Sequence, residues 1–161
     1  MTRPQVQPET PKSEAHEIVV VRRFAAPRAL VFRNWLEADA LMDWFAPDSF
    51  TTLSAKADAR PGGAWRVEYR SPDGMTVLEH GIYQEIAAPE RLVMTLTQVV
   101  NGRANPETTI TLTFKEADGA TVMTFRQTGF ESADRRDCNA EGWGGCFDQL
   151  ERRVAKLVAE V

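Results

Sequence analysis

The sequence predicts an α+β domain in which a curved antiparallel sheet packs against one long C-terminal helix. Between residues 49 and 129, apolar and polar side chains alternate with the two-residue period of a half-buried strand. Turn sequences rich in glycine and proline divide this region into about six strands. Residues 139–161 instead carry apolar side chains at helical spacing. A helix of this kind buries its apolar side by lying across the sheet.

Length and composition are those of a single-domain globular protein. The chain has 161 residues, of which 43% are hydrophobic and 26% charged, enough for one core with an internal cavity. We expect one domain over residues 16–161. Residues 1–15 hold three prolines and almost no apolar side chain, which is typical of a disordered tail.

Charge, hydropathy and cysteine content exclude several kinds of partner and site. The net charge of −4 gives no reason to expect a nucleic-acid partner, and no apolar run is long enough for membrane insertion. Cys138 and Cys146, if both lie on one helix, are roughly 12 Å apart along its axis, too far for a disulfide. Free thiols indicate a reducing cytoplasm. With only His16 and His80 as imidazoles, we expect no metal site, and we expect no cofactor.

The first elements are a strand and two short helices. Residues 16–24 (HEIVVVRRF) are rich in β-branched residues, which predicts a strand. In residues 26–47, Pro27 suits the first position of a helix. A break near Ala38 then starts a second helix, with Asp39 as its N-cap.

Six further strands follow, separated by turns. Residues 64–70 (AWRVEYR) show the clearest alternation, with Trp65, Val67 and Tyr69 on one face. The turn sequence SPDG that follows returns the chain antiparallel. The expected strands are residues 49–57, 64–70, 76–86, 92–100, 108–116 and 121–129, which with the first strand give a sheet of about six to seven strands.

The C-terminal helix carries three glycines, each of which costs about 1 kcal/mol relative to alanine in a helix interior. On a helical projection, Gly142 and Gly144 lie on the two shoulders of the apolar stripe beside Trp143, whereas Gly145 points nearly opposite and has no explanation. The missing side chains either let the helix pack closely on the sheet or leave a cavity beside the indole. The stripe itself consists of Trp143, Phe147, Leu150, Val154, Leu157 and Val161, with Cys146 and Val158 widening it.

Four segments in this order resemble the Hsp90-ATPase-activator-like family. They are RRFAAPRALVFRNWLEADALMDWFAP, ADARPGGAWRVEYRSPDG, HGIYQEIAAPERLVMTL and EGWGGCFDQLERRV, and the resemblance covers about residues 17–158. The family belongs to the START-like (helix-grip, SRPBCC, Bet v 1-like) superfamily. The resemblance implies a hydrophobic cavity between sheet and helix, which favours the cavity interpretation of the glycines. Function is implied less closely, because the superfamily includes lipid carriers, hormone receptors, cyclases and a co-chaperone.

The candidate cavity is lined by aromatic and aliphatic residues of several strands and the helix. We expect Tyr69, Tyr83 and Gln127 to be its hydrogen-bonding groups, since a buried hydroxyl or amide needs a partner, which a ligand can supply. Gly142 and Gly144 would shape the cavity from the helix. The alternative is that all these residues are simply core. The full candidate set is Trp65, Val67, Tyr69, Tyr83, Met94, Met123, Phe125, Gln127, Trp143 and Phe147.

No catalytic group stands out in the sequence, and we assign no catalytic residue. Strand alternation places His80 on the face opposite Tyr83, and no Ser or Cys is placed to act as its nucleophile. The acidic strand residues that we expect to be solvated are Glu68, Glu79 and Glu85.

We therefore expect a domain that holds a small apolar ligand in the cavity without catalysis. An enzyme of the cyclase or hydratase type is the first alternative, and a carboxylate, a tyrosine or His80 pointing into the cavity would favour it. The second alternative is a co-chaperone of an Hsp90-type ATPase or a stress-response interaction protein, which an exposed apolar or charged patch outside the cavity would favour. The pattern carries no signal for the oligomeric state.

Overall fold

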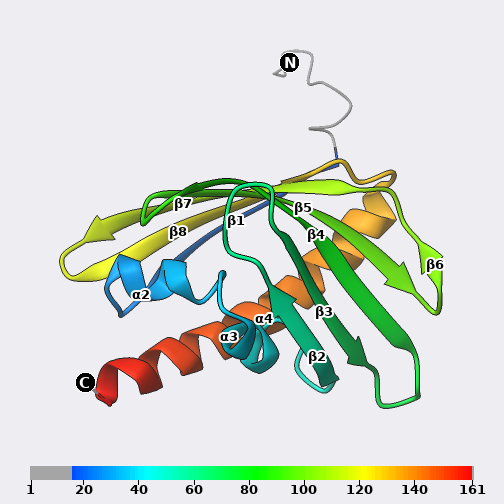
Figure 1. Cartoon of the computed structure of the whole chain (residues 1–161), viewed down its shortest axis with the longest axis horizontal. Coiled ribbons are helices and arrows are strands. Elements are labelled where there is room, and N and C mark those ends of the chain that lie inside the picture. The colour runs from blue at the N-terminus through cyan, green and yellow to red at the C-terminus, as the bar shows by residue number, and fades with distance from the viewer. Residues whose placement is uncertain (1–15, 161) are drawn as a thin grey trace, which may run out of the picture.

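The computed structural model describes residues 16–160, which form one antiparallel sheet and three helices (Figure 1). The strands are β1 (Ile18–Phe24), β2 (Thr51–Ala57), β3 (Ala64–Arg70), β4 (Thr76–Ala87), β5 (Arg91–Val100), β6 (Arg103–Ala104), β7 (Thr108–Ala117) and β8 (Ala120–Thr128). The helices are α2 (Arg28–Arg33), α3 (Ala38–Trp44) and α4 (Ala133–Ala159). The strand order is β1-β8-β7-β5-β4-β3-β2, and β6 pairs with β5.

This architecture confirms the α+β helix-grip fold predicted from the sequence. Each expected strand is present with its ends within two residues of the prediction, and the two-residue β6 is an addition. The disordered tail expected for residues 1–15 lies outside the described residues, as does Val161. No helix between residues 16 and 160 combines the length and the hydropathy needed to cross a membrane.

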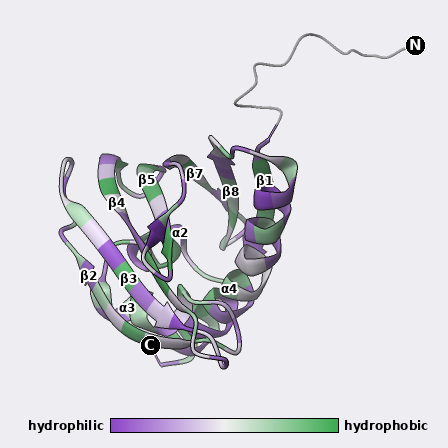
Figure 2. Ribbon diagram, turned by 90° about the vertical axis from the view of Figure 1, so that its right-hand side faces the viewer, coloured by the Kyte–Doolittle hydropathy of each residue, from purple (hydrophilic) through white to green (hydrophobic). Residues whose placement is uncertain are grey.

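The long helix α4 lies on the concave side of the sheet and runs across it (Figures 1 and 2). It begins at the N-cap Ser132, whose hydroxyl accepts a 3.1 Å hydrogen bond from the Arg135 backbone N–H. Its buried residues are Trp143, Cys146, Phe147, Leu150 and Val154. Val158, which the projection adds to the stripe, is 40% exposed because the last turn of α4 extends past the core.

The two short helices begin one or two residues away from the predicted caps. Pro27 is the N-cap of α2 rather than its first residue, since its backbone is extended and its carbonyl accepts the first helical hydrogen bonds. Glu37 occupies the corresponding position in α3, where its carbonyl accepts from the Leu41 N–H. Asp39 therefore lies in the first turn of α3 instead of capping it.

An aromatic cluster fills the core between the short helices, α4 and β8. Trp35, in the link between α2 and α3, is its centre, with ring centroids 4.7–6.3 Å from those of its neighbours. These neighbours are Trp44, Phe45, Phe125, Trp143 and Phe147. The middle of α4 is therefore anchored by tightly packed rings.

Candidate functional site

A cavity of about 660 Å³ lies where the N-terminal half of α4 passes over the sheet. Its walls come from α4, from β3, β4 and β5, and from the loop between α3 and β2. This volume is within the range of small-molecule sites, roughly 300–1,000 Å³. Apolar lining residues include Phe45, Phe50, Met75, Val77, Val100 and Trp143, and polar ones include Asp48, Tyr69, Glu79, Gln98, Arg135 and Glu141.

Two glycines of α4 face this space. A Cβ added at Gly142 would lie 3.8 Å from Pro47 Cγ, and one at Gly145 would lie 3.5 Å from the Asp48 backbone nitrogen. These are ordinary van der Waals distances, so close packing does not require either glycine. Both residues line the cavity.

Gly144 does not line the cavity, in contrast to the expectation from the helical projection. It is exposed, and a Cβ added there would meet no atom within 4 Å. The cavity lies on only one flank of Trp143, the flank that faces the loop between α3 and β2. Gly145 lies on this flank, which explains the glycine that the sequence pattern leaves without a role.

Glu79 of β4 is a buried acid in the cavity wall. It is 5% exposed, and its Oε2 accepts a 2.8 Å hydrogen bond from Gln98 Nε2. The Tyr69 hydroxyl also donates to this carboxyl group. Burial raises the pKa of Glu79 to about 7, and the hydrogen bonds from Gln98 and Tyr69 act in the opposite direction. The expectation that Glu79 is a solvated strand residue is wrong.

Strand alternation contains the signal that identifies Glu79. Val77, Glu79 and Tyr83 are odd-numbered positions of β4 and all three are buried, so they share the concave face of the sheet. A register shift between Tyr83 and Glu85 returns Glu85 to the exposed face, as expected for a solvated residue. Glu68, on β3, is half-buried and accepts a hydrogen bond from Ser54.

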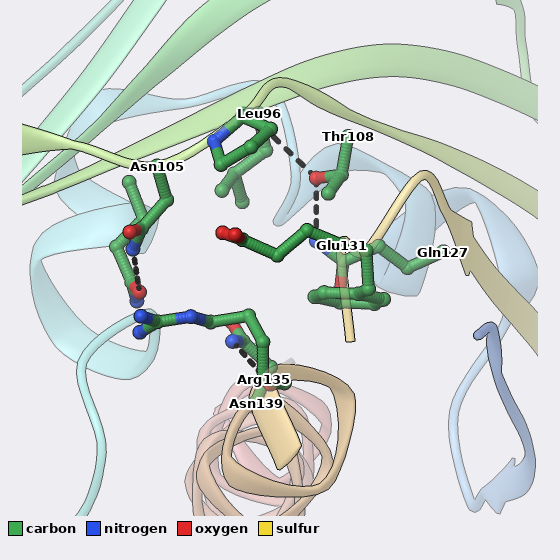
Figure 3. Close-up of a pocket in the computed structure, with 10 residues that line it drawn as sticks. Leu96, Asn105, Thr108, Gln127, Glu131, Arg135 and Asn139 are labelled. Atoms are coloured by element: carbon green, nitrogen blue, oxygen red, sulfur yellow. Dashed lines mark hydrogen bonds between the residues drawn. The ribbon is translucent and has the colours of Figure 1, made fainter. Parts of the chain in front are cut away.

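The amide of Gln98 is held in place by Asn105. Asn105 Nδ2 donates to Gln98 Oε1 at 3.2 Å, so the Gln98 NH₂ group faces Glu79. A second, smaller pocket lies beside this amide. Figure 3 shows the hydrogen bond of Asn105 in this pocket, with the Arg135 side chain extending across it from α4. Gln98, Arg135 and Asn139 line both this pocket and the larger cavity, so the two spaces adjoin.

Two other titratable groups near Glu79 remain protonated at neutral pH. Cys146 Sγ donates to the Phe45 carbonyl at 3.1 Å. Burial, and secondarily the nearby Glu79, raise the pKa of the Cys146 thiol and of the Tyr69 hydroxyl well above their ordinary values. Cys146 is therefore not an activated nucleophile. Of these three groups, Glu79 alone titrates near neutrality.

All ten residues expected to line the cavity are buried, but only Tyr69 and Trp143 line it. Most of the others pack against one another instead of facing empty space. Those that belong to the packed core are Trp65, Val67, Tyr83, Met94, Met123, Phe125 and Phe147.

Two of the three expected polar groups lie outside the cavity lining and bond to partners elsewhere in the core. The Tyr83 hydroxyl donates to the Trp35 carbonyl at 2.8 Å. Gln127 Oε1 accepts a 2.8 Å hydrogen bond from the Trp143 indole N–H. Of the expected set, only Tyr69 therefore presents its polar group to the cavity.

A wider depression of about 1010 Å³ lies elsewhere on β2 to β5. His80 and Trp65 both line it; His80 is exposed, and the buried Trp65 indole donates to the Thr95 carbonyl at 3.1 Å. Every charged residue of its lining is exposed or half-buried, so this depression is a solvated surface feature. The cavity that contains Glu79 is therefore the candidate functional site.

Comparison with known protein families identifies one that matches most of the chain. A family model described as "Activator of Hsp90 ATPase homolog 1-like protein" matches residues 25–155, which include every residue that lines the cavity. The chain belongs to this family. This membership confirms the resemblance found in the sequence. The family is part of the START-like (SRPBCC) superfamily.

Solved structures of several bacterial proteins share the fold of this chain. Protein CV1439 from Chromobacterium violaceum is 26% identical, with a TM-score of 0.76 over 86% of this chain and 97% of that chain. Protein NE0264 from Nitrosomonas europaea is 25% identical, with a TM-score of 0.74 over 89% and 96%. The AHSA1 (SPO3351) protein from Silicibacter pomeroyi, at 18% identity and a TM-score of 0.76 over 90% and 99%, shows likeness of fold alone. No curated protein matches the chain.

Proposed function

We propose that this domain binds a small, largely apolar molecule in the cavity between α4 and the sheet. The observation that carries the proposal is the volume of about 660 Å³ left open beside Gly142 and Gly145. The space opens to solvent beside the exposed residues Asp48 and Glu141, so a small molecule can enter it. Mostly apolar walls with a few polar groups are typical of small-molecule sites.

The polar groups indicate how the molecule would be oriented. Tyr69, Glu79 and Gln98 meet at the sheet wall, while Phe45 and Phe50 line the wall formed by the loop between α3 and β2. A ligand would place a hydrogen-bonding group against Glu79 and its apolar body against the rings.

The test combines native mass spectrometry with binding of the neutral fluorescent reporter N-phenylnaphthylamine. Gly142→Leu places a side chain in the cavity and should weaken reporter binding about tenfold or more. Gly144→Leu is the matched control, because its side chain would extend into open space and leave binding unchanged. Equal binding by wild type and Gly142→Leu would locate the reporter elsewhere and contradict the proposal. A small molecule present in the native but absent from the denatured mass spectrum would support it.

The position of Glu79 favours a second candidate function, acid–base catalysis on the bound molecule. A carboxyl group with a pKa of about 7 in an apolar cavity can both accept and donate a proton near neutral pH. The test is to incubate the molecule recovered from the protein with wild type and with Glu79→Gln. A product of altered mass formed by wild type alone would identify an enzyme, and an unchanged molecule would leave binding as the function.

A further inference from the structure

Within residues 16–160, the buried acid of the cavity has no positively charged partner. Glu79 is hydrogen-bonded to Gln98 and Tyr69, which are both neutral donors. Arg135 also lines the cavity, but it is not among the groups that shift the pKa of Glu79. Buried carboxylates are ordinarily paired with a cation or a metal. A ligand that carries a positive charge can supply this missing partner.

The walls around Glu79 are suited to a cation with an apolar body. Four aromatic side chains line the cavity: Phe45, Phe50, Tyr69 and Trp143. The Phe50 and Tyr69 rings meet at 5.5 Å, and the Phe45 and Trp143 rings at 5.3 Å, each pair edge to face. Aromatic faces attract ammonium groups, an effect that strengthens where water is excluded.

The charged residues at the edge of the cavity also favour a cationic ligand. Asp48 and Glu141 line it from the loop and from α4, so the lining carries three carboxyl groups with Glu79, against the single guanidinium of Arg135. The two edge acids are exposed and therefore contribute mainly to attraction at a distance. An anionic ligand would meet unfavourable charge at most positions along these walls.

We infer that the cavity binds a small organic amine, with its ammonium group against Glu79 and its hydrocarbon body along the aromatic walls. This inference rests on the proposed function and specifies its ligand class. The ammonium donates a charge-assisted hydrogen bond to the Glu79 carboxylate, while Gln98 and Tyr69 keep their own hydrogen bonds to the same group.

Binding of such a ligand depends on pH in a specific direction. With a pKa of about 7, Glu79 is roughly one-tenth ionised at about pH 6 and roughly nine-tenths at about pH 8. An alkylamine remains protonated across this range. Tyr69 on β3 and Cys146 on α4 face Glu79 but stay neutral, and the other charged groups of the lining are Asp48, Arg135 and Glu141. The affinity for the amine should therefore rise about tenfold from pH 6 to pH 8.

The experiment displaces N-phenylnaphthylamine with three molecules of similar size and different charge: phenylbutylamine, phenylbutanol and phenylbutyrate. At about pH 8 the amine should displace the reporter at a concentration about tenfold lower than the alcohol, with the carboxylate the weakest. Glu79→Gln should remove the advantage of the amine and its pH dependence. Glu85→Gln, an exposed acid of the same strand, should change neither.

The outcomes separate this inference from the function on which it rests. Equal displacement by amine and alcohol, or strongest displacement by the carboxylate, would overturn the ligand class while leaving a working apolar cavity. A reporter that fails to bind wild type would overturn both proposals. Should Glu79→Gln fail to fold, the pH series on wild type still decides, because a flat amine affinity between pH 6 and pH 8 is incompatible with pairing to Glu79.

Discussion

The two halves of α4 lie on the same sheet but contact it differently. In the C-terminal half, Phe147, Leu150 and Val154 are buried, and the Phe147 ring lies 5.3 Å from that of Phe125 on β8. In the N-terminal half, Gly142 and Gly145 face a cavity of about 660 Å³. One half of the helix closes the core, and the other half covers an open space.

This difference shows how one helix can carry both a stable core and a weak, open segment. The three glycines together cost roughly 2–3 kcal/mol of helix stability. The aromatic contacts of Trp143 and Phe147 with the core fix the helix where the two halves meet. The open half is therefore held in place by its neighbour rather than by its own packing.

The largest expected effect tests the packed half. Phe147→Ala removes a fully buried ring that contacts Trp44, Phe125 and Trp143, and should lower the free energy of unfolding by about 3–5 kcal/mol. Val158→Ala, on the same helix but 40% exposed, should change it by less than about 0.5 kcal/mol. Urea unfolding measures both. Similar losses in the two variants would mean that the C-terminal half is no better packed than the surface.

The next effect tests the acid in the open half. The ordinary pKa of Glu79 is 4.5 and its folded value is about 7, so between these values the folded protein holds a proton that the unfolded chain has released. The free energy of unfolding therefore falls as pH rises through this window, by about 3 kcal/mol from this group. Glu79→Gln removes that contribution. Relative to wild type, the variant should gain up to about 3 kcal/mol as pH rises from about 4.5 to about 7.

The control for this pH dependence is Glu85→Gln. Glu85 lies on the same strand but is exposed and pairs with Arg91 at 3.2 Å. The difference in free energy of unfolding between Glu85→Gln and wild type, measured by urea unfolding, should show no comparable trend across the same pH range. If the difference between Glu79→Gln and wild type is as flat with pH as that of Glu85→Gln, Glu79 is solvated, as the sequence first suggested.

The fold was predictable from the sequence because it depends on periodicity. The alternation in residues 64–70 and the helical spacing of Phe147, Leu150 and Val154 each determine which face is buried. The caps of the short helices were displaced by one or two residues, because Pro27 and Glu37 contribute their carbonyls rather than side chains. Such backbone roles leave little trace in residue type.

The site was predictable only in part. Periodicity shows that a residue such as Tyr83 is buried, but it does not show whether that residue faces a neighbour or an empty space. Glu79 was missed because a charged strand residue was expected to be solvated, although strand alternation places it on the same face as Tyr83. Gly145 was missed because the cavity wall opposite it comes from the loop at Asp48, far away in sequence. Long-range loop positions carry no periodic signal.

The smallest expected effect decides between the two interpretations of the glycines. A Cβ at Gly142 or Gly145 meets no atom closer than 3.5 Å, so alanine at either position should raise the free energy of unfolding by about 0.5–1 kcal/mol through helix propensity alone. Gly144→Ala, in open space, sets the reference value. Gly81→Ala is the opposite control and should destabilise, because its Cβ would overlap the Thr95 carbonyl.

Thermal or urea unfolding of these four alanine variants distinguishes a cavity wall from a packing contact. If Gly142→Ala and Gly145→Ala stabilise as much as Gly144→Ala, the helix has retained glycines that its packing does not need, and the open volume is the remaining physical reason for them. If both destabilise as Gly81→Ala should, the helix lies closer to the loop than 3.5 Å, and the contrast between the packed and open halves of α4 disappears.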